Sequence, residues 1–113
     1  MSKPVLLDGI RVTDLTTVFF GPYCTHTLAD LGAEVIKLEP AGGDSVRLIG
    51  NPPQTQGMGP VFMRLNRGKR NIDWDLRTDG GREAIRRLLE TSDVFIHNIR
   101  LEAVERLGLG YET

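Results

Sequence analysis

The chain has 113 residues, a net charge of −1, and 40% hydrophobic and 26% charged residues, as expected for one soluble globular domain. The near-neutral charge excludes recruitment of nucleic acid or an anionic membrane by the field of the whole molecule. A single cysteine excludes an internal disulfide, and with no secretory or membrane-spanning stretch the sequence predicts a cytoplasmic protein without nucleic-acid or membrane partners.

The stretch from Ile10 to Pro40 predicts one βαβ unit, the crossover that joins two parallel strands. Its first strand is Ile10–Leu15. Arg11 and Asp14 interrupt the apolar character of this strand, which predicts one partly wet face.

A short helix is expected next. Pro22 fits the first helical position, where its missing N–H is harmless. Cys24, Leu28 and Leu31 have the spacing of a core-facing stripe, and Gly32 predicts the end of the helix.

The second predicted strand, Glu34–Leu38, is apolar at its centre, as in a buried parallel strand. Residues 40–60 hold five of the thirteen glycines and four of the six prolines, which predicts a long Gly/Pro-rich loop. For Val61–Asn66 the sequence favours neither a helix nor an extended segment.

The second half repeats the strand–helix order. Asn71–Leu76 alternates apolar and polar residues and predicts a strand, and Thr78 predicts the N-cap of a helix. The apolar face of that helix comprises Ala84, Ile85, Leu88 and Leu89. Val94–Ile99 predicts a fourth strand, and a last short helix follows, with Leu101, Val104 and Leu107 on one face and Gly108 at its end.

The order β-α-β-loop-β-α-β-α predicts an α/β fold with a Rossmann-like parallel sheet. A four-stranded parallel sheet with an uncovered edge is a poor solution by itself. We therefore expect residues 1–113 to form the N-terminal part of a larger doubly wound domain.

Two kinds of ligand site fit this order of elements. Glu39, at the end of the second strand, has the position of a residue that holds the ribose of a dinucleotide, but Gly21 is the turn's one glycine where the fingerprint needs three. The basic run Arg67–Arg70 suits phosphates or forms a solvated turn. P-loop, G-x-S-x-G and metal-ligand spacings are absent, and both histidines are isolated, so no metal is predicted.

Several stretches together resemble one family, the class III (CaiB/BaiF-like) coenzyme A transferases, which include formyl-CoA transferase, carnitine CoA-transferase and α-methylacyl-CoA racemase. The resemblance runs from Gly9 to Tyr111. It is carried by GIRVTDLTTVFFGPYCTHTLADLGAEVIKLEPAGGD, LNRGKRNIDWDL, GREAIRRLLETSDVFIHNIR and VERLGLGY.

The resemblance implies a large Rossmann-like domain that binds CoA, within an interlocked homodimer. In the transferases an aspartate attacks an acyl-CoA thioester, giving a mixed anhydride and then an aspartyl-CoA thioester, from which a carboxylic acid acceptor takes the CoA. That aspartate lies beyond the region matched here. No catalytic residue is therefore expected in this chain, which we expect to be inactive alone.

The resemblance also carries individual CoA-binding positions. It places Val18, Phe19 and Phe20 in the loop that lies against CoA near its reacting end. It places Trp74 and Arg77 beside the adenine and its ribose phosphate.

Further positions lie in the second half of the chain. Asn98, Ile99 and Arg106 match CoA contacts at the fourth strand end and the following helix, and Arg100 matches an arginine near the CoA phosphates in racemase-like members. Lys69 and Arg70 lie in the family's asparagine-x-x-lysine-arginine segment and are included as candidate binding residues.

Two departures from the family pattern are evident. His97-Asn98-Ile99-Arg100-Leu101-Glu102 stands where many members have glutamate-asparagine-phenylalanine-arginine-proline-glycine, and Pro40 stands where formyl-CoA transferase has an arginine. The sequence favours CoA transfer between an acyl-CoA and a carboxylic acid. The alternatives are part of a racemase-like isomerase, a stand-alone CoA- or nucleotide-binding module without catalysis, and a non-functional truncated product.

Overall fold

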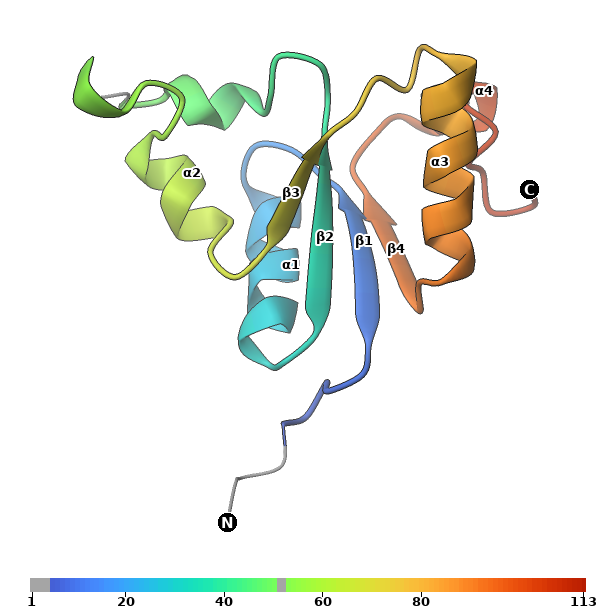
Figure 1. Cartoon of the computed structure of the whole chain (residues 1–113), viewed down its shortest axis with the longest axis horizontal. Coiled ribbons are helices and arrows are strands. Elements are labelled where there is room, and N and C mark those ends of the chain that lie inside the picture. The colour runs from blue at the N-terminus through green and yellow to red at the C-terminus, as the bar shows by residue number, and fades with distance from the viewer. Residues whose placement is uncertain (1–4, 51–52) are drawn as a thin grey trace.

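The computed structural model describes residues 5–50 and 53–113. Within these residues, four strands, four α-helices and two short 3-10 turns follow one another along the chain (Figure 1). In order they are β1 (Arg11–Leu15), α1 (Phe20–Asp30), β2 (Glu34–Glu39), η1 (Ser45–Leu48), η2 (Pro53–Thr55), α2 (Pro60–Leu65), β3 (Arg70–Asp73), α3 (Asp79–Glu90), β4 (Val94–His97) and α4 (Leu101–Arg106). Within the described ranges no helix is long and apolar enough to cross a membrane.

The four strands form one parallel sheet in the order β3-β2-β1-β4, which confirms the predicted Rossmann-like α/β fold. The chain builds outward from β1 through β2 to β3 and then returns to place β4 on the other side of β1. The direction of winding therefore reverses between β1 and β4. In open α/β sheets, ligands bind at the carboxyl ends of the strands beside such a reversal.

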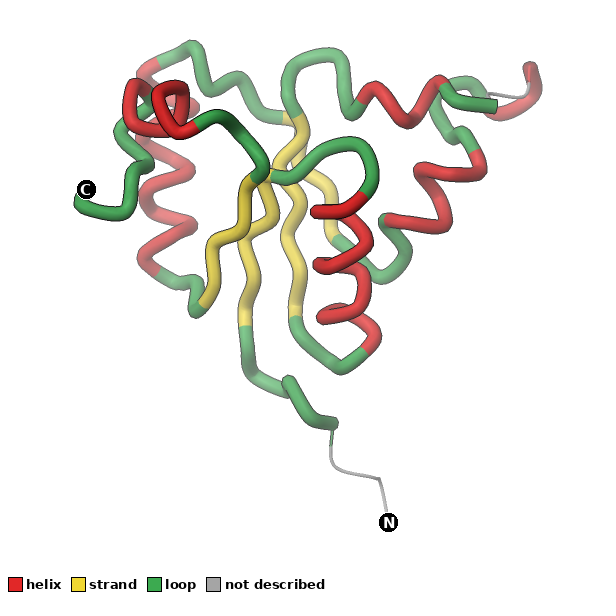
Figure 2. The backbone as a smooth tube through the Cα atoms, turned by 180° about the vertical axis from the view of Figure 1, so that it is seen from behind, coloured by secondary structure: helices red, strands yellow, loops and turns green. Residues whose placement is uncertain are grey.

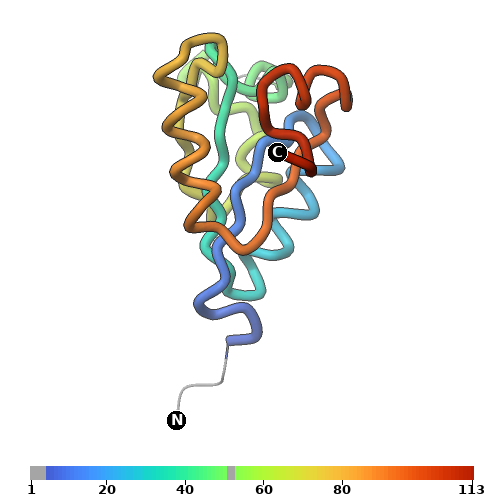
Figure 3. The backbone as a smooth tube through the Cα atoms, turned by 90° about the vertical axis from the view of Figure 1, so that its right-hand side faces the viewer, coloured from blue at the N-terminus to red at the C-terminus, as the bar shows by residue number. Residues whose placement is uncertain are grey.

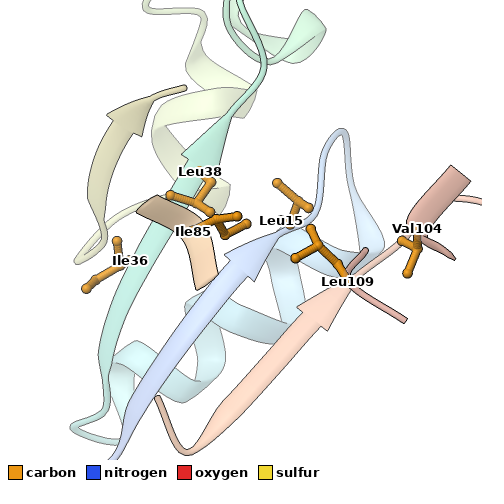
Figure 4. Packing of buried hydrophobic residues seen from close by; sticks show 6 residues of the cluster. All are labelled: Leu15, Ile36, Leu38, Ile85, Val104 and Leu109. Atoms are coloured by element: carbon orange, nitrogen blue, oxygen red, sulfur yellow. The ribbon is translucent and has the colours of Figure 1, made fainter. Parts of the chain in front are cut away.

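Helices cover both faces of the sheet. Seen from the side, α3 lies on one face and α1 on the other (Figure 3), and in the reverse view α1 stands in front of the strands (Figure 2). The core on the α3 face is a cluster of apolar side chains from β1, β2, α3, α4 and the segment after α4 (Figure 4), namely Leu15, Ile36, Leu38, Ile85, Val104 and Leu109.

Local sequence signals set several of the element ends as predicted. The hydroxyl of Thr78 accepts a hydrogen bond from the Gly81 N–H and caps α3. Gly32 has a φ of 106° and Gly108 one of 72°, conformations that stop a helix and favour glycine. Ile85 is fully buried, which confirms the predicted apolar face of α3.

Other boundaries differ from the prediction. Strand β3 ends at Asp73, so Trp74 and Leu76 lie outside the sheet, where both pack against the α3-side core. Strand β4 ends at His97. The undecided segment after Gly59 is helix α2, and two 3-10 turns interrupt the predicted loop 40–60.

The predicted core stripe of α1 is confirmed for Leu28, which packs against a buried cluster of Val12, Ala33 and Val35, and is wrong for its other two residues. Cys24 is exposed and Leu31 is 39% exposed, whereas the helix buries Pro22, Thr25 and His26. The helix begins at Phe20, two residues earlier than expected. Thr25 is buried because its hydroxyl donates to the buried carboxylate of Asp14 in β1.

The predicted wet face of β1 is also wrong, because Asp14 is completely buried. Its carboxylate accepts hydrogen bonds from the Thr16 backbone N–H at 2.8 Å and from the Thr25 hydroxyl at 2.6 Å. Asp14 therefore belongs to a buried polar cluster. Its carboxylate oxygens are hydrogen-bonded, as is usual for buried polar groups because an unpaired one is costly.

Candidate functional site

A small apolar pocket lies at the carboxyl edge of the sheet. Its volume is about 160 Å³, and its walls come from the ends of β1 and β2 and from the segments after β3 and β4. The lining residues are Leu15, Thr17, Leu38, Glu39, Pro40, Trp74, Leu76 and Ile99. Two of the predicted CoA-binding residues, Trp74 and Ile99, thus meet in one pocket although 25 residues separate them in sequence. An aromatic ring and aliphatic side chains suit a planar, weakly polar ligand group.

Arg77 lines a second, neighbouring hollow, which shares Pro40, Trp74 and Leu76 with this pocket. Its guanidinium is exposed and makes two hydrogen bonds with the carboxylate of Asp75, the shorter at 2.9 Å. The hydrogen bond and the charge of Asp75 raise the pKa of Arg77, which therefore stays a cation at this edge.

The loop between β1 and α1, together with Phe20 at the start of α1, presents apolar side chains to solvent at the same edge. Val18, Phe19 and Phe20 are 45%, 51% and 86% exposed, and the two phenylalanine rings pack edge to face with centroids 5.9 Å apart. Val18 has a φ of 74°. This conformation is strained for a β-branched residue.

Asn98, which follows β4, joins this loop to the fourth strand. Its amide donates to the Thr17 carbonyl at 2.8 Å and accepts from the Thr17 N–H at 3.2 Å. Arg100 and Arg106 are exposed at the two ends of α4, and neither guanidinium has an ion-pair or hydrogen-bond partner among the described residues. Both cations are therefore free to meet an anion.

Lys69 does not reach this edge. Its side chain is fully buried, and its ammonium contacts Asp14 at 3.0 Å, the Asn66 side chain at 2.8 Å and the Pro22 carbonyl at 3.0 Å. These three contacts use its three N–H donors. Burial lowers the pKa of Lys69, and the charge and hydrogen bond of Asp14 oppose that shift. A direct contact between Lys69 and a ligand is therefore not supported by this geometry.

Arg70 lies at the opposite end of the sheet from the pocket. It opens β3, where it pairs in register with Ile36, and its guanidinium is 3.3 Å from the carboxylate of Glu34. Of the predicted binding residues, the structure gathers Val18, Phe19, Phe20, Trp74, Arg77, Asn98 and Ile99 at the carboxyl edge. Arg100 opens α4 just after β4, and Arg70 is separated from this group by the length of a strand.

Two ion pairs behind this edge were not anticipated. Lys37 and Asp44, both with fully buried side chains, are 2.8 Å apart, and Arg47 donates to Glu39 at 2.8 Å. The Arg47 guanidinium also stacks 3.7 Å from the centroid of the Phe62 ring. A sequence signal existed, because Lys37 and Glu39 alternate with apolar residues in a buried strand and so share one face.

Burial and neighbouring cations act against each other on these carboxyl groups. Burial alone would raise the pKa of Glu39, but the hydrogen bond from Arg47 and the N–H of Asp44 outweigh it and the pKa is lowered. In the same way the Lys37 ammonium and the N–H groups of Val46 and Val18 overcome burial and lower the pKa of Asp44. Both groups are carboxylates at neutral pH. No three His, Cys, Asp or Glu side chains within residues 5–50 and 53–113 converge to hold a metal ion.

A parallel sheet with a winding reversal, an apolar pocket and cations at that edge defines an α/β protein with a site of the nucleotide-binding kind. Comparison with known proteins shows the family within this class. Residues 7–113 match CoA-transferase family III, and the chain belongs to that family.

Several curated relatives are CoA-transferases. The chain is 46% identical over 112 residues to a succinyl-CoA:mesaconate CoA-transferase from Haloarcula hispanica, and 42% identical over 113 residues to a succinate–glutarate CoA-transferase from Agrobacterium fabrum. Each match covers 95% of this chain and 28% of the relative. The chain thus spans little more than a quarter of the length of these relatives.

Solved structures agree with the fold. A CAIB/BAIF family protein from Brucella suis is similar with a TM-score of 0.88 and 41% identity, covering 97% of this chain and 30% of that one. Rv3272 from Mycobacterium tuberculosis is similar with a TM-score of 0.85 and 40% identity, covering 98% and 30%.

Proposed function

We propose that this chain forms the N-terminal, CoA-binding part of a family III CoA-transferase, an enzyme that moves CoA between an acyl-CoA thioester and a carboxylic acid. The observation that carries the proposal is the pocket at the winding reversal, where Trp74 and Ile99 converge beside the cationic Arg77. The family membership and the names of the relatives support CoA as the ligand.

The chemistry of CoA matches the distribution of groups at this edge. The adenine ring fits the apolar pocket between Trp74 and Ile99. The ribose 3′-phosphate and the pyrophosphate would be held by arginines, whose forked donors pair with phosphate oxygens. Arg77, Arg100 and Arg106 are the exposed candidates. The apolar part of the pantetheine arm lies along the Val18–Phe20 loop.

The acyl-transfer step itself is assigned outside these residues. Asp14, Glu39 and Asp44 are buried and bonded to cations or hydroxyls, so none of them offers a free carboxylate to a thioester. We propose that the nucleophilic aspartate, the acceptor site and the interlocked homodimer belong to the longer protein. The 113-residue chain alone is then expected to bind acyl-CoA without transferring CoA.

Trp74 is the chain's one tryptophan, so its fluorescence reports directly on the pocket. The expected result is saturable quenching of Trp74 emission on titration with CoA, together with a rise in melting temperature, because a ligand selective for the folded state stabilises it. Succinyl-CoA, named for several relatives, is the thioester to compare. Unchanged emission and unchanged melting at millimolar CoA, in a sample shown to be folded, would overturn the proposal.

A further inference from the structure

The loop between β1 and α1 holds a conformation that its own sequence does not favour. Among the described residues, Val18 is the one non-glycine residue with a positive φ, at 74°. A β-branched side chain disfavours this region, and such backbone strain persists where the surrounding structure holds it.

Asp44 holds the backbone of Val18 directly. The Val18 N–H lies 3.2 and 3.3 Å from the two carboxylate oxygens of Asp44. The Asp44 side chain is itself completely buried, and it caps η1 by accepting the Val46 N–H at 3.1 Å. Contacts outside the loop therefore also hold the Asp44 carboxylate in place.

Lys37 contacts the same carboxylate and also the backbone of the loop. Its buried ammonium is 2.8 Å from Asp44 and donates to the Thr16 carbonyl at 3.2 Å. Lys37 and Asp44 thus bind the main chain on either side of Thr17, at the Thr16 carbonyl and the Val18 N–H. The backbone of Thr17 itself is hydrogen-bonded to Asn98, which follows β4. The contacts that Asp44, Lys37 and Asn98 make with this loop are all to its backbone groups.

The side chains of Val18, Phe19 and Phe20 make none of these contacts. Val18, Phe19 and Phe20 stay exposed, on the side where the pantetheine arm was placed. We infer that Asp44, braced by Lys37, is a positioning residue that holds the Val18 backbone so that these three side chains face the apolar arm of CoA. This inference rests on the proposed function. Asp44 does not itself touch CoA, and its carboxylate form is the one that the Val18 N–H needs.

The test compares two ligands in the 113-residue chain: CoA, and adenosine 3′,5′-bisphosphate, which lacks the pantetheine arm. In Asp44→Asn the amide is a poorer acceptor and Lys37 loses its counter-ion. The expected result is a loss of CoA affinity of roughly fivefold or more, as for removal of a charge-assisted hydrogen bond. The affinity for adenosine 3′,5′-bisphosphate stays within twofold of the unsubstituted chain. The Val18 amide also exchanges its proton faster with solvent.

Two further variants sharpen the test. Asp44→Glu keeps a counter-ion beside Lys37, but its extra methylene moves the oxygens from the Val18 N–H. We expect the same selective loss. Asp30→Asn removes a carboxylate from the far end of α1, where its side chain is 49% exposed, and leaves both affinities unchanged.

The outcomes separate the inference from the proposed function. If the Asp44 variants lose affinity for both ligands equally, or for neither, the inference is overturned. CoA binding by the unsubstituted chain, which is the proposed function, is not affected by either result. If the unsubstituted chain binds neither ligand, the proposed function and the ligand-facing role both fail. The Val18 amide exchange then decides whether Asp44 holds the loop.

Discussion

At the residue scale, Arg77, which we propose binds a phosphate of CoA, is already hydrogen-bonded to a carboxylate. Asp75 accepts two hydrogen bonds from the guanidinium and lies on the same exposed segment. A phosphate must compete with this carboxylate or share the arginine with it. The affinity for CoA is therefore set by both residues together.

Arg77→Ala is expected to weaken CoA binding roughly tenfold or more, because a forked contact to a phosphate is lost. Asp75→Asn is expected to tighten binding, because the competing negative charge is gone. Titration of Trp74 fluorescence with CoA measures both changes. Opposite signs for the two variants support the assignment, and an Arg77→Ala variant that binds CoA like the unsubstituted chain would contradict it.

Glu39 shows how a residue's role changes once its neighbours are known. Its position at the end of β2 fits a dinucleotide ribose contact. In the structure one oxygen of its carboxylate accepts from the Asp44 N–H at 2.9 Å and from the Arg47 guanidinium at 2.8 Å. Glu39 lines the pocket, but its carboxylate is committed to the segment after β2.

At the scale of elements, the segment from β2 through η1 depends on ionised carboxylates. The pKa values of Glu39 and Asp44 are lowered from the ordinary 4.5 and 3.8 by their cations and N–H donors, against the effect of burial. A carboxyl group with a lower pKa in the folded state stabilises the fold above its unfolded pKa. That stability is lost as the pH falls through the folded value.

We therefore expect the free energy of unfolding to fall as the pH drops below about 4.5. Urea denaturation followed by circular dichroism between pH 7 and pH 3 measures this loss. In Glu39→Gln the slope of stability against pH over this range should be shallower, since one of the two groups no longer titrates. A slope unchanged by that substitution would show that other carboxyl groups dominate.

The packing of α1 against the sheet depends on a second buried charge. Asp14 accepts from Thr16, Thr25 and Lys69, which lie just after β1, in α1 and in the turn before β3. Removing the carboxylate leaves a buried ammonium without its counter-ion. One partner removed from a buried pair costs more than the intact pair contributes.

Asp14→Ala is expected to lower the free energy of unfolding by about 3–5 kcal/mol. Urea denaturation at pH 7 measures it. The matched control is Glu83→Gln, which breaks an exposed ion pair with Arg87 on α3 and should change stability little. Comparable losses in the two variants would mean that the buried cluster is not what holds α1.

At the scale of the whole molecule, the sheet has an open side. Strand β4 is an edge strand, and a wide hollow of about 720 Å³ lies along it, lined by residues of α3, β4 and the C-terminal segment. Val94 on this edge is 37% exposed, and Leu101 and Tyr111 are 63% and 99% exposed. Unpaired strand edges and exposed apolar side chains favour association between chains.

We expect the 113-residue chain to self-associate in a concentration-dependent way. Val94→Lys should reduce that association, because a lysine on an edge strand opposes strand pairing. Sedimentation velocity at several protein concentrations measures both. A chain that stays monomeric and unfolds in one sharp cooperative transition would contradict the expectation.

The features that could be predicted from the sequence are local. The spacing of apolar residues predicted the four strands, the parallel order of elements and the buried face of α3, and single residues such as Thr78 and Gly108 predicted helix ends. These features follow from backbone geometry within a few residues. The resemblance to the CoA-transferases added candidate residues, several of which meet at one edge of the sheet.

Contacts between residues far apart in the sequence could not be predicted from it. Asn98 bonds to Thr17, 81 positions away, and Lys69 is buried against Asp14 instead of facing a ligand. The burial of Thr25 in place of Cys24 depends on the charge across from α1. Hydrogen bonds and ion pairs depend on distance in space, and the packing of separate elements brings these groups together.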